Sequence, residues 1–316
     1  NIVAQAPYNN LILYYPFDDN FDKQNDTIFD YSGQGNNALF HNKFLRFYSQ
    51  KNNHHRGSEC FSGGCAFFHG QYVPGGLEYF ELNKTIQFDS NPFTIMGWMK
   101  TNYRGELGGL AGRIWHSGYN GGNPDFEIYY HNQGNLFVYM RDSNGAQTPI
   151  GHTKIVSDGN WHHFAFIRDA TNFYFIVDNV AQSYSAVGWA DLDSPNVKPL
   201  IGRSIFNNLQ GSQSNYYQFF NGSLDEIMVF NTGLTTQQVL DIYRNQSIRF
   251  MSSGTLQYGA IEPLRVDSIL GLIDCEDSAC WTNLSDPSTC DPNRNNEGSP
   301  QCRDGKDNDN DTLVDC

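Results

Sequence analysis

Carboxylates alternate with other residues near the end of the chain, in the stretch "DNDNDTLVDC" (307–316). Counted from its first aspartate, the stretch matches positions 1, 3 and 5 of an EF-hand calcium loop, with a backbone carbonyl at 7 and an acid at 9. Thr312 replaces the glycine expected at position 6, and position 12 would fall beyond Cys316. We predict a Ca²⁺ site here, with a solvated acidic linker as the alternative. The predicted ligands are Asp307, Asp309, Asp311, Leu313 and Asp315.

The net charge of -14 is unevenly distributed along the 316 residues. Residues 274–316 carry eleven acids and three bases, which is more than half of the excess negative charge. So acidic a chain repels nucleic acid and anionic membrane surfaces, and we expect no nucleic-acid partner. No apolar run approaches the length of a transmembrane helix, so we predict no membrane span.

Two further acids, Asp125 and Glu127 in "PDFEIYY" (124–130), have the spacing of a carboxylate pair. Residues two apart on a strand face the same side, and retaining glycosidases need two carboxyl groups about 5–5.5 Å apart. The chain lacks the G-x-S-x-G, H-E-x-x-H and P-loop motifs, and no G-x-G-x-x-G occurs in its required context. We therefore predict that the protein is not an enzyme.

Seven cysteines occur, and five of them lie within residues 274–316. Without a CxxC pair or zinc spacing, this pattern is typical of a disulfide-stapled segment in an oxidising compartment. Cys60 and Cys65 enclose the short loop "FSGG", which favours a local disulfide. In the tail, pairing of nearest neighbours would join Cys275 to Cys280 and Cys290 to Cys302. Cys316 would have no partner in this scheme, and the connectivity is open.

Six Asn-x-Ser/Thr sequons also agree with secretion, the last of them at Asn310 inside the predicted calcium loop. We expect a secreted or cell-surface protein. The predicted glycosylation sites are Asn25, Asn83, Asn221, Asn245 and Asn283.

Short strand-like runs separated by Gly, Asn and Asp turns fill residues 11–243. Many short strands without helices between them indicate an antiparallel two-sheet jelly-roll sandwich. His162 and His163 are neighbours on one such run, so we predict that they point to opposite faces with structural roles. The clearest strands are residues 11–17, 93–99, 126–131, 135–141, 163–168, 173–178 and 222–230.

One short helix is predicted at residues 235–246, where Thr235 and Gln238 have capping-box spacing. The fold class is therefore all-β, with one short C-terminal helix and a disulfide-rich irregular tail. We divide the chain into an extended N-terminal arm (1–10), the jelly roll (11–246), a strand-like linker or donor segment (247–273) and a Cys/Asp-rich calcium-repeat tail (274–316).

The order of segments resembles the laminin-G-like, concanavalin A-like lectin/glucanase jelly-roll family. The resemblance rests on "LILYYPFDDN", "DYSGQGNNALF", "CAFFHGQYV", "NPFTIMGWMK", "DGNWHHFAFIRD", "FYFIVDNV", "LIGRS" and "FNGSLDEIMVFNTGLTTQQVLDIY". It implies a structural calcium held by Asp18, Asp30 and Asp225, although these acids could instead be turn and strand-end residues. The third acid of the E-x-D-x-x-E pattern of related glucanases is missing. The tail resembles the Asp-rich calcium repeats of secreted proteins, including thrombospondin type 3 repeats.

The sequence leaves three functions open. The first is a structural subunit or adhesin of an extracellular assembly, in which residues 1–10 or 247–273 would pair with a sheet of the next copy and build a fibre. The second, implied by the family, is a carbohydrate-binding module using the loop at 113–125, and the third is the glucanase-like enzyme. The predicted glycan contacts are Trp115, Tyr119, Asn120 and Asp125, with Trp115 as a core residue the alternative.

Overall fold

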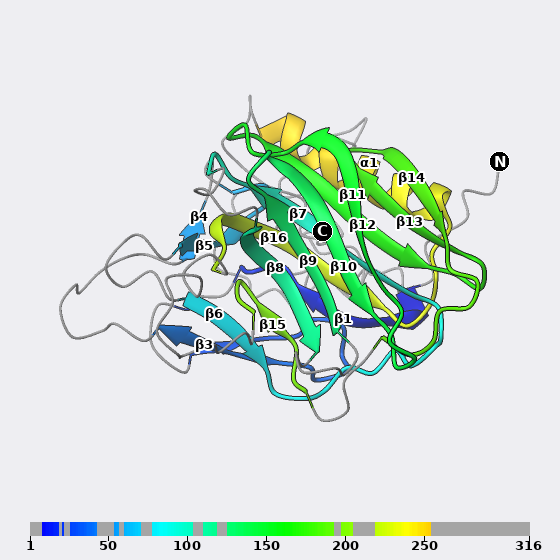
Figure 1. Ribbon diagram of the computed structural model, residues 1–316. Coiled ribbons are helices and arrows are strands. Elements are labelled where there is room, and N and C mark those ends of the chain that lie inside the picture. Colours follow the sequence, from blue (N-terminus) through cyan, green and yellow to red (C-terminus); the bar gives the residue numbers. More distant parts are fainter. Residues whose placement is uncertain are drawn as a thin grey trace, which may run out of the picture. The chain divides into compact units, whose positions relative to one another are not determined.

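The computed structural model describes residues 8–18, 21, 26–42, 54–56, 60–70, 78–103, 110–118, 125–192, 197–204 and 219–253. The chain forms two compact units, residues Asn1–Tyr243 and Arg244–Cys316. The first unit contains the strands, and its architecture is the predicted antiparallel two-sheet sandwich (Figure 1).

The first sheet has eight strands in the order β14-β13-β12-β7-β16-β5-β4, with β1 also paired to β16. Every pairing in it is antiparallel. The strands are β1 (Leu11–Tyr15), β4 (His54–Arg56), β5 (Gly64–His69), β7 (Phe93–Lys100), β12 (Trp161–Arg168), β13 (Asn172–Val177), β14 (Val180–Ser185) and β16 (Asn221–Phe230).

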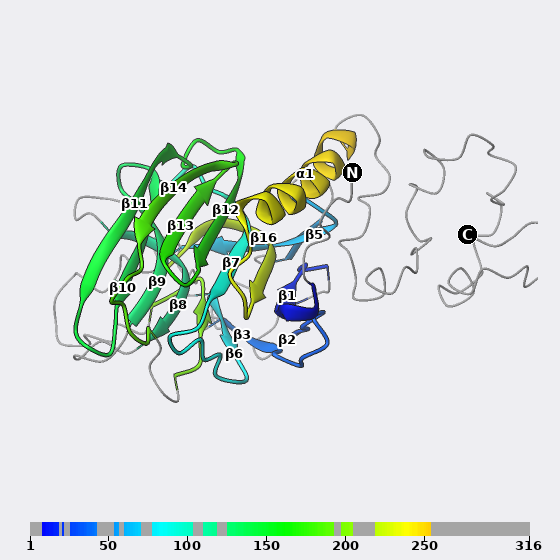
Figure 2. The same cartoon turned by 90° about the vertical axis from the view of Figure 1, so that its right-hand side faces the viewer.

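The second sheet also has eight antiparallel strands, in the order β11-β10-β9-β8-β15-β6-β3-β2. Figure 2 shows strands β8–β11 of this sheet lying beside β12–β14 of the first. The strands are β2 (Thr27–Ile28), β3 (Ala38–Asn42), β6 (Glu78–Leu82), β8 (Leu110–Gly118), β9 (Asp125–His131), β10 (Asn135–Arg141), β11 (Gln147–Ile155) and β15 (Leu200–Ile201).

Along strand β10, buried residues alternate with partly exposed ones. On β10 the buried side chains are Leu136, Val138 and Met140, while the intervening residues are half-buried. The inward residues of both sheets form one apolar cluster rich in phenylalanine. Burying each aromatic side chain contributes about 1.5–3 kcal/mol, so this cluster is the main source of stability.

A second apolar cluster covers the other face of the first sheet, where Met96, Ala165 and Met228 pack with Val239 and Ile242 of helix α1 (Thr236–Ser253). The predicted capping box is present. The backbone N–H of Thr235 donates to Gln238 Oε1 at 2.9 Å, and the N–H of Gln238 donates to Thr235 Oγ1 at 3.2 Å.

Both ends of the sandwich differ from the prediction. Helix α1 continues to Ser253, so residues 247–253 are helical rather than strand-like, because no glycine or proline interrupts the sequence before Gly254. Tyr8–Asn10 form a 3-10 helix (η1) instead of an extended arm. Tyr8 packs on Phe230 with ring centroids 6.3 Å apart, which draws this segment onto the second apolar cluster.

Candidate functional site

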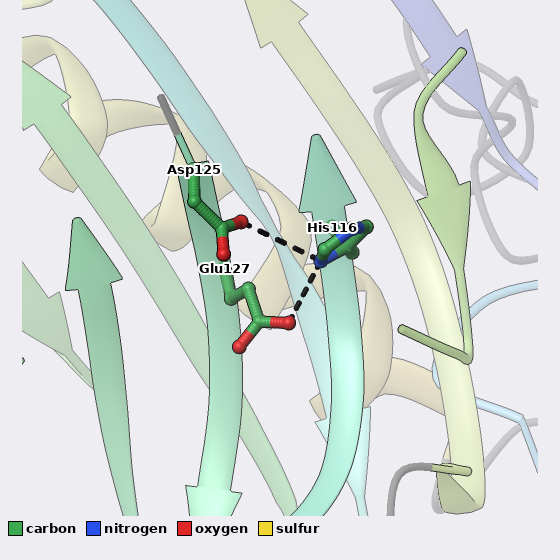
Figure 3. A group of neighbouring side chains, drawn as sticks. All are labelled: His116, Asp125 and Glu127. Carbon is green, nitrogen blue, oxygen red and sulfur yellow. Dashed lines mark hydrogen bonds and ion pairs between the residues drawn. The ribbon is translucent and has the colours of Figure 1, made fainter. Parts of the chain in front are cut away.

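The outward face of the second sheet carries a buried polar cluster on strands β8 and β9. Phe126 and Ile128 of β9 point into the apolar core, so Asp125 and Glu127 point the other way. The register of β8 and β9 places His116 opposite Glu127. Figure 3 shows the imidazole directed at both carboxylates.

Glu127 is the most heavily bonded member of the cluster. Its Oε2 accepts from Arg113 Nε at 3.1 Å and lies 3.0 Å from Arg113 Nη2. Its Oε1 accepts from Ser204 Oγ at 2.8 Å and lies 2.7 Å from His116 Nδ1. Arg113 thus donates to one oxygen of Glu127 and Ser204 to the other, while His116 Nδ1 lies within hydrogen-bond distance of Oε1.

Asp125 is equally buried but poorly bonded. Its Oδ1 lies 3.8 Å from His116 Nδ1 and has no hydrogen-bond partner within the part of the chain that the structure describes. Only 2% of Asp125 is exposed. An oxygen of this kind is costly to bury, because it loses its water and gains no donor.

The two carboxyl groups have pKa values shifted in opposite directions. Burial, and then the charge of Glu127, raise the pKa of Asp125 to about 6. Burial alone would also raise the pKa of Glu127, but the Arg113 guanidinium and the His116 ring outweigh it and hold that pKa well below its usual range. Glu127 is therefore the fixed anion of the cluster, and Asp125 is the group whose charge is most easily changed.

Strands β10 and β11 continue the same face with a half-exposed row, Phe137, Tyr139, Arg141 and Gln147, which we call the β10–β11 row. The Tyr139 hydroxyl donates to Gln147 Oε1 at 2.9 Å, and Arg141 Nη2 donates to both at 3.1 and 3.0 Å. Phe137 stacks on Tyr129 at 5.8 Å, and a Cβ at Gly151 would lie 2.5 Å from the Phe137 ring. The row thus presents flat rings and polar groups side by side.

The predicted glycan contacts have different outcomes. Trp115 is 1% exposed and belongs to the core, so its assignment as an exposed platform is wrong. Its Nε1 donates to Ser117 Oγ at 3.2 Å. Asp125 lies in the polar cluster on the outward face, as its spacing from Glu127 predicts. Tyr119 and Asn120 lie outside the described residues.

Of the acids implied as calcium ligands in the jelly roll, Asp30 is bonded to protein donors at both oxygens, from Tyr14 N, Ser32 N, Ser32 Oγ and Asn36 N. Both oxygens of Asp30 therefore already accept hydrogen bonds from the protein. Asp225 Oδ2 accepts from Phe61 N and Ser62 N, and Asp18 Oδ1 accepts from Gly64 N.

Asp18 and Asp225 therefore hold the loop that the Cys60–Cys65 disulfide closes, with its Cα atoms 5.3 Å apart. Burial, and then the charge of Glu226, raise the pKa of Asp225 well above its usual range. A calcium held by Asp18, Asp30 and Asp225 stays a prediction.

Several other predictions fall outside the described residues: the calcium ligands 307–315, the cysteines from Cys275 onward, and the sequons at Asn25 and Asn283. Asn83 and Asn245 are exposed. The Asn221 amide donates to the His69 carbonyl at 3.2 Å, so its nitrogen is already engaged in the fold. The strand-exchange segments, 1–10 and 247–273, lie mostly outside the described residues, and self-association stays a prediction.

Sequence reasoning missed His116, Arg113 and Ser204, although it found both acids between them. The alternation of polar residues in "NLFVYMR" could have identified Tyr139 and Arg141 as outward-facing. No comparable signal exists for His116, because its position depends on the register of β8 against β9.

A comparison with family profiles matches residues 74–240, more than half of the chain, to the concanavalin A-like lectin/glucanases superfamily. The chain belongs to this superfamily. No curated protein matches the sequence. Among the residues that the structure describes, no helix has the length and apolar character needed to cross a membrane.

Solved structures of the same architecture include toxin domains. The binding domain of botulinum neurotoxin serotype G has a TM-score of 0.50 and 15% identity, over 76% of this chain and 52% of that one. The binding domain of Paraclostridial Mosquitocidal Protein 1 has a TM-score of 0.49 and 16% identity, over 75% and 53%. The chain thus spans about half the length of these toxin domains.

Another similar structure is domain 4 of a GH43 extracellular arabinanase from Geobacillus stearothermophilus, in complex with arabinotriose. It has a TM-score of 0.49 and 17% identity, over 73% of this chain and 97% of that one. At these identities the likeness concerns the fold alone.

Proposed function

We propose that this protein is a non-catalytic glycan-binding domain of a secreted or surface protein, and that the glycan lies along the β10–β11 row. The observation that carries the proposal is the half-exposed network of Tyr139, Arg141 and Gln147 on the outward face of the second sheet. Membership of a superfamily that includes lectins supports the same function.

The chemistry of the row suits a sugar. Sugar rings present apolar C–H faces edged by hydroxyl groups, and a tyrosine ring offers a flat apolar surface with a polar tip. The Gln147 amide nitrogen and the Arg141 guanidinium supply donors beside the Tyr139 ring. Because these three side chains already bond to one another, little side-chain entropy is lost when a ligand binds.

The bonding of Glu127 supports binding over hydrolysis. A retaining glycosidase needs one carboxylate free to attack the sugar and a second to protonate the leaving group. Glu127 has the lower pKa, but Arg113, His116 and Ser204 occupy both of its oxygens. The cluster is thus better suited to holding the face rigid than to supplying a nucleophile.

A glycan array followed by titration of the best ligand would test this function. Tyr139→Ala should weaken binding at least tenfold, or about 1.4 kcal/mol, because it removes both the ring and the hydroxyl. Tyr139→Phe should cost less, since it removes only the hydroxyl. Phe29→Ala is the matched control, because Phe29 is an exposed aromatic residue (52%) outside the row.

Two results would refute the proposal: an array that stays blank with calcium and with a chelator, or binding that Tyr139→Ala leaves unchanged. Hydrolysis of an array ligand that is lost in Glu127→Gln would instead assign an enzyme.

A further inference from the structure

Three side chains that commonly ligate metals converge on the outward face of the second sheet. One ligand atom from each of His116, Asp125 and Glu127 lies within 4.8 Å of the others, and the described residues contain no other group of three. Two neighbouring strands position them, since β8 carries the histidine and β9 carries both acids (Figure 3). The site is thus built on rigid elements rather than on a loop.

The orientation of His116 suits a ligand. Its Nε2 lies 3.1 Å from the Gly118 carbonyl oxygen, which can only accept a hydrogen bond, so Nε2 carries a proton. In the neutral ring Nδ1 then has a lone pair, and this lone pair faces Glu127 Oε1 at 2.7 Å and Asp125 Oδ1 at 3.8 Å. Electron-rich atoms that face one another in this way are stabilised by a cation between them, such as a proton on Nδ1 or a metal ion.

A proton on Nδ1 satisfies only part of the cluster. It bonds to Glu127 Oε1, which already accepts from Ser204 Oγ, and it leaves Asp125 Oδ1 at 3.8 Å, beyond hydrogen-bond distance. This oxygen is buried and has no hydrogen-bond partner in the described ranges. A metal ion can contact all three atoms at once, so it would provide the missing partner.

We propose that His116, Asp125 and Glu127 bind a divalent transition-metal ion of the zinc class. One imidazole and two carboxylates form a mixed nitrogen and oxygen set, which favours Zn²⁺ over Ca²⁺, since calcium takes six to eight oxygen ligands. Arg113 bonds to Glu127 through Oε2, which leaves Oε1 directed at the site. With a neutral imidazole, two carboxylates and one guanidinium give a local charge of about -1, which attracts a cation.

Zinc titration of the full chain by calorimetry would test this site, with excess Ca²⁺ present to occupy the Asp-rich tail. Asp125→Asn removes the charge of the unpartnered oxygen and leaves the Arg113–Glu127 ion pair intact. It should weaken binding at one site at least tenfold. Glu81→Gln is the matched control, because Glu81 lies on the same face of the same sheet but outside the cluster. It should leave the affinity unchanged.

A second readout guards against variants that fold poorly. Excess Zn²⁺ should raise the melting temperature of the wild-type protein and of Glu81→Gln, and raise it less in Asp125→Asn. His116 should show shifted ring-nitrogen NMR signals in the zinc-loaded protein, assigned with His116→Gln. Zinc binding that Asp125→Asn leaves unchanged would overturn the proposal, as would no binding, which would assign the cluster to a proton-bridged ion pair. Neither result depends on whether a glycan binds.

Discussion

Replacing Glu127 by alanine should lower the free energy of unfolding by about 3–5 kcal/mol, the range for breaking a buried ion pair on one side. The carboxylate is 2% exposed and neutralises Arg113, whose Nη2 lies 3.0 Å away. Alanine would remove the carboxylate that contacts the buried guanidinium, together with an acceptor of Ser204 Oγ. Urea denaturation at pH 7 measures the loss directly.

The control for this variant is Glu81→Ala, an exposed acid of the same sheet whose partners lie 3.7 and 3.9 Å away. Exposed pairs are weak, so its cost should stay below about 1 kcal/mol. The double variant Glu127→Ala/Arg113→Leu should lose less unfolding free energy than the sum of the two single losses, because it removes both partners of the ion pair. A loss below about 1 kcal/mol for Glu127→Ala would show that the cluster does not hold the sheet together.

When the pH falls from 7 to 4, the free energy of unfolding should decrease by about 3 kcal/mol more in the wild-type protein than in the His163→Phe variant. His163 is fully buried between Trp98 and Tyr243, with ring centroids 5.2 and 5.5 Å away. Neither ring nitrogen has a hydrogen-bond partner in the described part of the chain. Burial therefore lowers the pKa of His163 from 6.5 to about 4, against a smaller opposing effect of Asp178.

The direction follows from proton uptake. Between pH 6.5 and 4 the unfolded chain protonates His163 while the folded protein keeps it neutral, so stability is fully present above 6.5 and is lost as the pH falls toward 4. The difference of about 2.5 between the pKa of His163 in the unfolded chain and in the folded protein corresponds to about 3 kcal/mol of unfolding free energy. Phenylalanine cannot be protonated. At pH 7 the His163→Phe variant should be at least as stable as the wild-type protein, because the substitution removes an unsatisfied donor.

The neighbouring His162 makes the comparison of variants necessary. Its Nδ1 lies 2.6 Å from Asp178 Oδ2 and its Nε2 lies 2.9 Å from Asp158 Oδ1. Burial opposes protonation of His162, but these carboxylates outweigh burial and raise its pKa, so its stabilising effect is lost as the pH rises through that raised value. The opposite pKa shifts of the two histidines partly cancel in the pH dependence of the wild-type stability. The difference in stability between the wild-type protein and His163→Phe isolates the contribution of His163. Parallel curves for the two proteins would contradict this account.

Alternation of residue types predicted the strands well and the site only in part. It placed Asp125 and Glu127 on one face and His162 and His163 on opposite faces, because side chains on a strand alternate strictly. The assignment of Trp115 as an exposed platform failed, and its alternative, a core residue, was correct: the register shifts between Arg113 and Trp115, and Ile114 and Trp115 are both buried. A bulge of this kind depends on the partner strand and has no local signal.

The polar cluster needed information that a single sequence does not contain. His116 meets the two acids only because β8 and β9 pair in one particular register across the segment between them. The helix end was likewise misplaced, because no glycine or proline marks it before Gly254. The capping box at Thr235 was correct, since it depends on residues three apart in the sequence.

The most direct test of the central claim is to locate a bound glycan on the protein. Protein with ¹³C-labelled tyrosine rings would be titrated with the best ligand from the array, with Tyr139 assigned through Tyr139→Phe. Binding along the β10–β11 row predicts saturable shifts at Tyr139 and Tyr129, and none at Tyr174 on the first sheet. Saturable shifts that spare Tyr139 and Tyr129 and appear on other tyrosines would contradict it.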